Sequence, residues 1–148
     1  MKNKVYVAYG SNMAIEQMAF RCPEATLLGT GALQNWRLMF KGSKTGAYAT
    51  IEREKGCTVP ILLWDITETD EAYLDHYEGF PNFYYKKNIM AETPEGKKKG
   101  MVYIMHEVRK LALPSERYYD ILAKAYRKFG FDMKILKEAY SYSGCPSH

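Results

Sequence analysis

The chain has 148 residues, of which 47% are hydrophobic, so it can bury a substantial core and fold unaided. The net charge of +4 is modest, and its densest cluster, Lys97–Lys99, falls in a predicted hairpin turn, which argues against a nucleic-acid-binding face. The three cysteines are far apart and form no C-x-x-C pair, which predicts free thiols and no zinc site.

The N-terminal residues lack the apolar core of a signal peptide, and no apolar run is long enough to span a bilayer. We therefore expect a cytoplasmic protein that binds neither membrane nor nucleic acid. The chain contains no linker, repeat or low-complexity segment. This predicts a single α+β domain over residues 1–148, with a flexible tail from about residue 141.

The first predicted element is a strand, residues 5–9, that runs into a tight turn at Gly10, Ser11 and Asn12. Residues 13–21 have helical character, so the turn stands between a strand end and a helix start. Unpaired backbone N–H groups at such a junction can bind an anionic oxygen such as a carboxylate. A simple turn with a helix N-cap is the alternative interpretation.

Strand-forming residues dominate the next part of the chain. The predicted strands are residues 26–40, which turn or bulge signals split in two, then residues 47–51 and 57–65. A loop over residues 41–46 and a polar turn over residues 52–56 are expected to separate them.

A helix is predicted from the N-cap Thr67 to Gly79, which ends it. Acidic residues fill its first turn, where the helix dipole favours them. Asp75 and His76 are expected to point away from its apolar stripe. At helical spacing, that stripe comprises Tyr73, Leu74 and Tyr77.

Glu78 stands out on this helix because it follows Leu74 by four residues and therefore falls on or beside the apolar face. It also occupies the last turn, where the helix dipole disfavours a negative charge. Both effects raise the pKa of a carboxyl toward the range that a general base needs. A side chain that bends out to solvent is the alternative interpretation.

Beyond this helix, a hairpin is predicted with strands at residues 83–92 and 100–105. Tyr84 and Tyr85 lie in its first strand, so one faces each side of the sheet, and the one on the core side can direct its hydroxyl toward Glu78. A helix over residues 115–129 and a short last helix capped by Asp132 complete the predicted elements.

Other chemistries lack their motifs. The histidines match neither metal nor catalytic-triad spacing, because H-E-x-x-H and G-x-S-x-G are both absent. The turn at Gly10 has too few glycines for a P-loop or a dinucleotide-binding loop.

Two motifs carry a family resemblance: Tyr9-Gly10-Ser11-Asn12 after an apolar strand, and Leu74-Asp75-x-x-Glu78-Gly79 before an aromatic-rich strand. Together they resemble the gamma-glutamylcyclotransferase family, and the similarity extends from about Val5 to about Tyr126. The resemblance implies a mixed β-barrel flanked by a few α-helices, with no metal or other cofactor.

The resemblance also implies roles for individual residues. Glu78 corresponds to the catalytic acid and base of the family. The implied substrate-binding residues are Tyr6, Val7, Ala8, Tyr9, Gly10, Ser11, Asn12, Tyr85 and Tyr118.

The implied activity is the intramolecular cyclisation of a gamma-glutamyl amino acid or amine to 5-oxoproline, with release of the free amine. Phe80-Pro81 after Gly79 is closer to the broader cyclotransferase-like branch, so the leaving amine stays open. The alternatives are a gamma-glutamylamine cyclotransferase and a non-catalytic module on the same fold that binds a small molecule or a partner.

Overall fold

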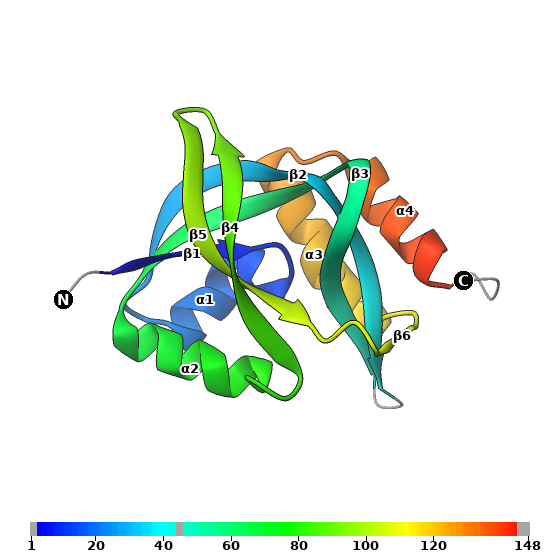
Figure 1. The fold of residues 1–148 in the computed structure, drawn as a ribbon, viewed down its shortest axis with the longest axis horizontal. Helices are drawn as coiled ribbons and strands as arrows, with labels where there is room; N and C mark the ends of the chain where they lie inside the picture. Colours follow the sequence, from blue (N-terminus) through cyan, green and yellow to red (C-terminus); the bar gives the residue numbers. More distant parts are fainter. Residues whose placement is uncertain (1–2, 44–45, 145–148) are drawn as a thin grey trace.

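The structure is a computed structural model that describes residues 3–43 and 46–144. Within these residues, a β-barrel is flanked by four α-helices (Figure 1). The strands are β1 (Lys4–Ala8), β2 (Thr26–Ser43), β3 (Gly46–Ile66), β4 (Tyr84–Thr93), β5 (Gly96–Met105) and β6 (Lys110–Leu111). The helical elements are the 3-10 turn η1 (Ser11–Met13), α1 (Ile15–Arg21), α2 (Glu68–Glu78), α3 (Glu116–Phe129) and α4 (Met133–Ser143).

The strand order β3-β1-β5-β4-β2 closes on itself, because β2 also pairs with β3, and β6 extends the edge of β2. β1 is antiparallel to β3 but parallel to β5, so the barrel is mixed. This confirms the predicted fold class.

Two glycines let neighbouring strands approach closely where the barrel closes. A Cβ on Gly100 would lie 2.7 Å from Cγ2 of Val7, where β5 meets β1. A Cβ on Gly31 would lie 2.6 Å from the carbonyl oxygen of Glu92, where β2 meets β4. Any larger residue would push these strands apart, because both distances are shorter than a packed Cβ tolerates.

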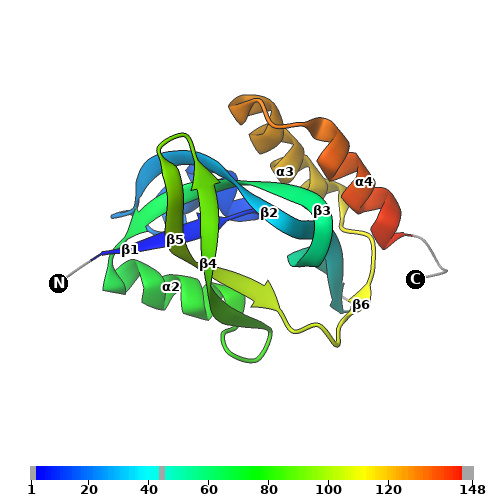
Figure 2. The same ribbon diagram turned by 45° about the horizontal axis from the view of Figure 1, so that its top comes forward.

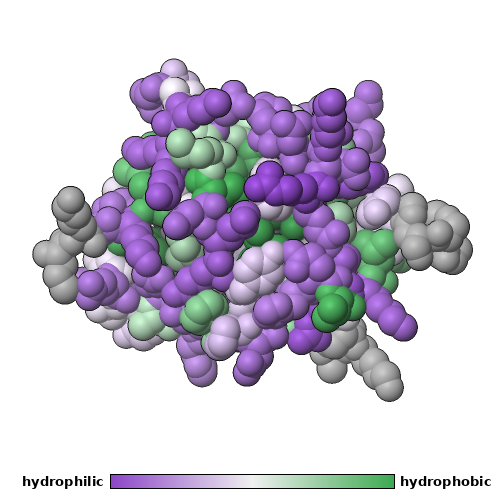
Figure 3. All heavy atoms as spheres, viewed as in Figure 1, coloured by the Kyte–Doolittle hydropathy of each residue, from purple (hydrophilic) through white to green (hydrophobic). Residues whose placement is uncertain are grey.

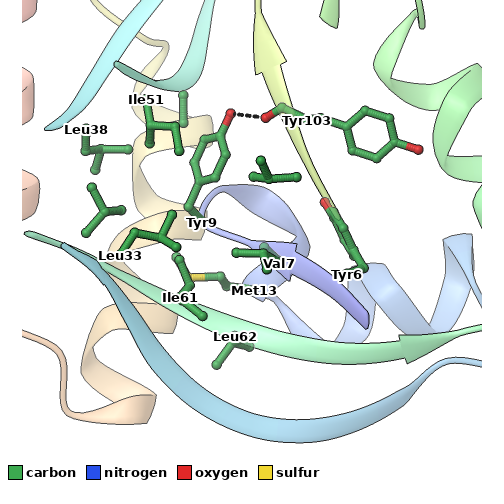
Figure 4. Close-up of a cluster of buried hydrophobic side chains, with 14 of the residues drawn as sticks. Tyr6, Val7, Tyr9, Met13, Leu33, Leu38, Ile51, Ile61, Leu62 and Tyr103 are labelled. Atoms are coloured by element: carbon green, nitrogen blue, oxygen red, sulfur yellow. Dashed lines mark hydrogen bonds between the residues drawn. The ribbon is translucent and has the colours of Figure 1, made fainter. Parts of the chain in front are cut away.

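The barrel interior holds apolar side chains from β1, β2 and β3, together with Met13 of η1 (Figure 4). Among them, the buried hydroxyl of Tyr9 donates a 2.6 Å hydrogen bond to the carbonyl oxygen of Tyr103 on β5 (Figure 4). The partner is needed because a buried hydroxyl without one costs about 1–3 kcal/mol. The bond therefore fixes the end of β1 against β5, directly before the turn at Gly10.

The signals that predict α2 are confirmed. The Thr67 hydroxyl accepts from the Asp70 N–H at 3.0 Å, the Asp70 carboxylate accepts from the Thr67 N–H at 3.1 Å, and Gly79 ends the helix with a left-handed φ of 64°. The predicted stripe is wrong for Tyr73 and Tyr77, which are 54% and 56% exposed. The fully buried residues of α2 are Asp70 and Leu74, and Glu71, Asp75 and Glu78 beside them are partly covered.

The predicted polar turn at residues 52–56 is wrong, because β2 and β3 are both long and pair along most of their lengths. The ladder register jumps between Gln34 and Trp36, so Asn35, with φ of 66°, faces a bulge on β3. The Gly56 N–H donates to Oδ1 of Asn35 at 3.0 Å across it. The glycine and asparagine signals therefore mark a bulge within continuous strands rather than a reversal of the chain.

The C-terminal helix α4 lies beside α3, away from α2, on the part of the barrel that β2 and β3 form (Figure 2). It includes residues 141–143, where the sequence suggested the start of a flexible tail. The buried Ser143 hydroxyl accepts from the Phe40 N–H at 2.8 Å and donates to the Ala139 carbonyl at 2.7 Å. Residues 145–148, with Cys145, lie outside the described part of the chain.

Hydrophilic residues cover most of the face shown in Figure 3, and smaller groups of hydrophobic residues are visible among them. None of the helices in the described residues has the length and apolar character needed to cross a membrane.

Candidate active site

A cavity of about 570 Å³ lies where η1 and α1 meet the end of α2 and the start of α3. It gathers residues that are far apart in the sequence. Its wall consists of Tyr6, Tyr9, Gly10, Ser11, Asn12, Gln17, Arg21, Tyr48, Ala49, Tyr77, Glu78, Phe83, Tyr84, Tyr103, Ser115, Arg117, Tyr118 and Ile121. The predicted turn and the predicted acidic residue are therefore brought together in one site.

The turn after β1 is held from several sides. The Met13 N–H donates to the Gly10 carbonyl at 3.0 Å, and Nε1 of Trp64 donates to the Asn12 carbonyl at 3.1 Å. The buried Asn12 amide donates to the Tyr6 hydroxyl at 2.8 Å. The N–H groups of Ser11 and Asn12 donate to no backbone carbonyl in the described residues. They are thus available to an anionic group in the cavity.

Gly10 is required by space rather than by a left-handed conformation, since its φ is −119°. A Cβ there would lie 3.3 Å from the Tyr118 hydroxyl oxygen and 3.4 Å from the Ala49 Cβ. With a ψ of −137°, the backbone of Gly10 lies outside the helical and extended regions, as expected, and the close contacts add a steric reason for a glycine. A larger residue at position 10 would fill the part of the cavity between η1 and Tyr118.

The Glu78 side chain extends from the last turn of α2 into the cavity wall. Burial raises the pKa of its carboxyl to about 7, and the nearby positive charge of Arg21 lowers it in part. Within the described residues this carboxyl makes neither a hydrogen bond nor an ion pair. A carboxyl with such a pKa can both accept and donate a proton near neutral pH.

Two tyrosines of the cavity are positioned by the backbone of one residue, Ala49. The Ala49 N–H donates to the Tyr118 hydroxyl at 3.1 Å, and the Tyr84 hydroxyl donates to the Ala49 carbonyl at 2.8 Å. Because the Tyr118 oxygen accepts this bond, its own O–H proton is free to point to another group. Burial raises the pKa of Tyr118, so this hydroxyl stays protonated at neutral pH.

Three residues that the resemblance placed at the substrate pocket are not on its wall, which is a correction. Val7 and Ala8 are buried in the strand β1, 1% exposed each. Tyr85 points to the opposite side of β4, because side chains alternate along a strand, and its hydroxyl donates to the Glu107 carboxylate. Tyr84 takes its place in the cavity. The remaining predicted residues all line it.

Arg21 is the main site residue that the sequence did not single out. Its guanidinium donates to the Asn12 side-chain carbonyl and to the Tyr77 hydroxyl, and to Oγ of Ser11 at 3.3 Å. It also lies over the Tyr77 ring, 3.5 Å from the centroid. Arg21 thus ties the turn to the end of α2, on which Glu78 stands.

No group of three or more histidine, cysteine, aspartate or glutamate side chains in the described residues is arranged to hold a metal ion. Cys22 and Cys57 are free thiols, as predicted. Burial raises the pKa of the Cys22 thiol to about 12, so it is a poor nucleophile at neutral pH.

Comparison with known proteins shows which family the chain belongs to. The family described as gamma-glutamyl cyclotransferase, AIG2-like, matches residues 6–127. The chain belongs to this family. Bovine gamma-glutamylcyclotransferase is 27% identical over 145 residues, with 93% of this chain and 77% of the relative covered. The human gamma-glutamylcyclotransferase is 28% identical over 138 residues, with 88% and 73% covered.

A solved structure of a gamma-glutamyl cyclotransferase superimposes with a TM-score of 0.84 at 26% identity, over 93% of this chain and 86% of that one. The family and the barrel that the two sequence motifs predicted are both confirmed. The matched residues span from the turn to α3 and include every charged residue of the cavity wall.

Proposed function

We propose that this protein is a gamma-glutamylcyclotransferase-type enzyme, with Glu78 as the acid and base. The observation that carries the proposal is the Glu78 carboxyl, which has a pKa raised to about 7 and faces a cavity beside unpaired turn amides. Family membership supports it, because the bovine and human relatives are gamma-glutamylcyclotransferases by name.

The reaction needs no water and no second substrate. Glu78 takes a proton from the α-ammonium of the gamma-glutamyl group, and the freed nitrogen attacks the side-chain carbonyl carbon. A carbon–nitrogen bond forms, which closes the five-membered ring, and the bond to the leaving amine breaks as Glu78 returns the proton to that nitrogen. The ring nitrogen gives up its remaining extra proton to the released amine, which leaves as an ammonium ion. The products are 5-oxoproline and the free amine. Cyclisation is mainly a matter of proximity, because both reacting atoms belong to one molecule.

The other cavity groups have complementary tasks. The N–H groups of Ser11 and Asn12 bind the α-carboxylate of the substrate, since the rigid turn presents them together. The Tyr118 hydroxyl donates to the carbonyl oxygen as it gains negative charge. Arg21 connects the turn to the end of α2. The amides that bind the substrate carboxylate and the carboxyl of Glu78 therefore stay at a fixed distance from each other.

The proposal is tested by incubating the protein with a panel of gamma-glutamyl amino acids and gamma-glutamyl amines and measuring 5-oxoproline. Glu78→Gln keeps the size of the side chain but removes its basicity, so kcat should fall by roughly a hundredfold or more. Glu68→Gln, an exposed position on the same helix, is the matched control and should keep the wild-type kcat.

Absence of 5-oxoproline with every member of the panel would overturn the enzymatic proposal and favour a binding module on this fold. Wild-type kcat in Glu78→Gln would retain the activity but remove Glu78 as the acid and base.

A further inference from the structure

A second basic residue lines the cavity in addition to Arg21. Arg117 lies in the first turn of α3, directly before Tyr118, and is largely exposed. Unlike Arg21, its guanidinium makes neither a hydrogen bond nor an ion pair with the described residues. It therefore presents its donors to whatever occupies the cavity.

The position of Arg117 corresponds to an outlet of the cavity. A groove between α1 and α3 shares three wall residues with it, namely Gln17, Arg117 and Ile121. The groove also contains Glu16, Glu116 and Asp120, and none of them forms an ion pair with Arg117. On the same shared wall, the side-chain oxygen of Gln17 is buried and has no hydrogen-bond partner within the described residues. The outlet thus offers an unused acceptor beside an unused cation.

The charges on the cavity wall fit a substrate with two carboxylates. Its charged residues in the described chain are Arg21, Glu78 and Arg117. Arg21 is engaged by the turn and Tyr77, and the turn amides account for one carboxylate of the substrate. Arg117 is therefore available to bind a second carboxylate of the substrate. A gamma-glutamyl amino acid carries such a second carboxylate on its leaving group, whereas a gamma-glutamyl alkylamine does not.

We propose that Arg117 is a specificity-determining residue that binds the α-carboxylate of the leaving amino acid, so that gamma-glutamyl amino acids are preferred over gamma-glutamyl alkylamines. The Gln17 carbonyl, next to it, accepts a hydrogen bond from the leaving nitrogen or its side chain. This inference rests on the proposed function and extends it to the substrate class.

The test uses two substrates that differ by one carboxylate: gamma-glutamylalanine and gamma-glutamylethylamide. Wild-type protein should prefer the alanine substrate by roughly two- to fivefold in kcat/KM, as an ion pair at an exposed site provides. The difference should come from a lower KM for the alanine substrate, with similar kcat for both substrates. It should decline as sodium chloride is added, because salt screens an exposed ion pair.

In Arg117→Gln the alanine-over-ethylamide ratio should fall to about one, and Arg117→Lys should retain part of it, because lysine keeps the charge but not the planar fork. Arg127→Gln removes the same charge from an exposed position on the same helix and should keep the wild-type ratio. Thermal melts of all variants check that they are folded.

Equal kcat/KM for both substrates in the wild-type protein, or an unchanged ratio in Arg117→Gln, would overturn the inference and leave the proposed function standing. If neither substrate yields 5-oxoproline, the proposed function fails and the inference fails with it.

Discussion

The carboxylate of Asp75 on α2 accepts a 2.6 Å hydrogen bond from the Tyr103 hydroxyl on β5. It also forms a 2.8 Å ion pair with Nζ of Lys86 on β4. The expectation that Asp75 points away from the packed side of its helix is therefore wrong. The flank of α2 beside Leu74 lies on the β4–β5 hairpin, and polar pairs instead of apolar side chains form that contact. Asp75 thus links the helix that carries Glu78 to the barrel.

Replacing Asp75 with Asn should lower the free energy of unfolding by about 1–2 kcal/mol, because the partly buried Lys86 and the buried Tyr103 lose a charged partner. Urea unfolding at pH 7 measures this, with Glu68→Gln as the control for loss of one negative charge from α2. Equal stability of Asp75→Asn and the control would show that the contact contributes nothing.

The raised pKa of Glu78 should make stability depend on pH. Because the folded-state pKa of about 7 is above the ordinary value of 4.5, the folded protein holds the proton more tightly than the unfolded chain does. The stabilisation from the protonated carboxyl is complete below about pH 4.5 and is lost as pH rises through 7. Relative to Glu78→Gln, the wild type should therefore lose on the order of 2–3 kcal/mol between pH 4.5 and pH 8.

Paired urea titrations of wild type and Glu78→Gln across this range provide the measurement. Parallel pH profiles for the two proteins would mean that the Glu78 carboxyl titrates normally.

Arg21 should control the pH at which catalysis begins. Its positive charge lowers the pKa of Glu78, so Arg21→Met should move the acidic limb of the kcat/KM profile to higher pH. Arg21→Lys keeps a charge but not the paired hydrogen bonds to Asn12 and Tyr77, so its limb should stay near the wild-type position while KM rises. If the acidic limb of the kcat/KM profile of Arg21→Met stays at the wild-type pH, Arg21 does not influence the pKa of Glu78 and only positions the turn.

Tyr118→Phe removes the hydroxyl that faces the cavity and that also accepts from the Ala49 N–H. We expect kcat to fall by roughly tenfold to a hundredfold, since a donor to the developing oxyanion is lost. The free energy of unfolding should fall by about 1 kcal/mol, because the buried Ala49 N–H loses its hydrogen-bond partner. Tyr119→Phe, the next residue on α3 but outside the cavity wall, is the kinetic control and should retain wild-type kcat.

The sequence predicted α2 and Glu78 well because their signals are local. Capping residues act within one turn of the helix, and the spacing from Leu74 to Glu78 places both on the same line of α2. The turn at Gly10 to Asn12 was likewise predicted from local signals, namely a glycine and small polar residues that follow an apolar strand. The roles of these residues in catalysis stay predictions.

What the sequence missed depends on contacts between distant segments. Tyr84 and Tyr85 follow the same strand alternation, and only the packing of β4 decides that Tyr84 faces the cavity. Arg21 carries no local signal, since its importance comes from Asn12 and from Tyr77 on another helix. Asn35 and Gly56 favour a turn and a bulge alike, and the pairing of β2 with β3 selects the bulge.

The parallel pairing of Tyr6 on β1 with Met101 on β5 joins the first strand to a residue nearly one hundred positions later. On a ribosome, β1 would leave the exit tunnel long before this partner is synthesised. Such long-range contacts raise the contact order and slow folding. The chain loses the entropy of closing a large loop before the hydrogen bonds between the two strands can form. Gly10, Glu78 and Tyr118 come together only once α3 is made. The site is therefore complete only when the C-terminal third of the chain has been made, and a truncated chain that lacks α3 would lack Arg117, Tyr118 and Ile121 from its wall.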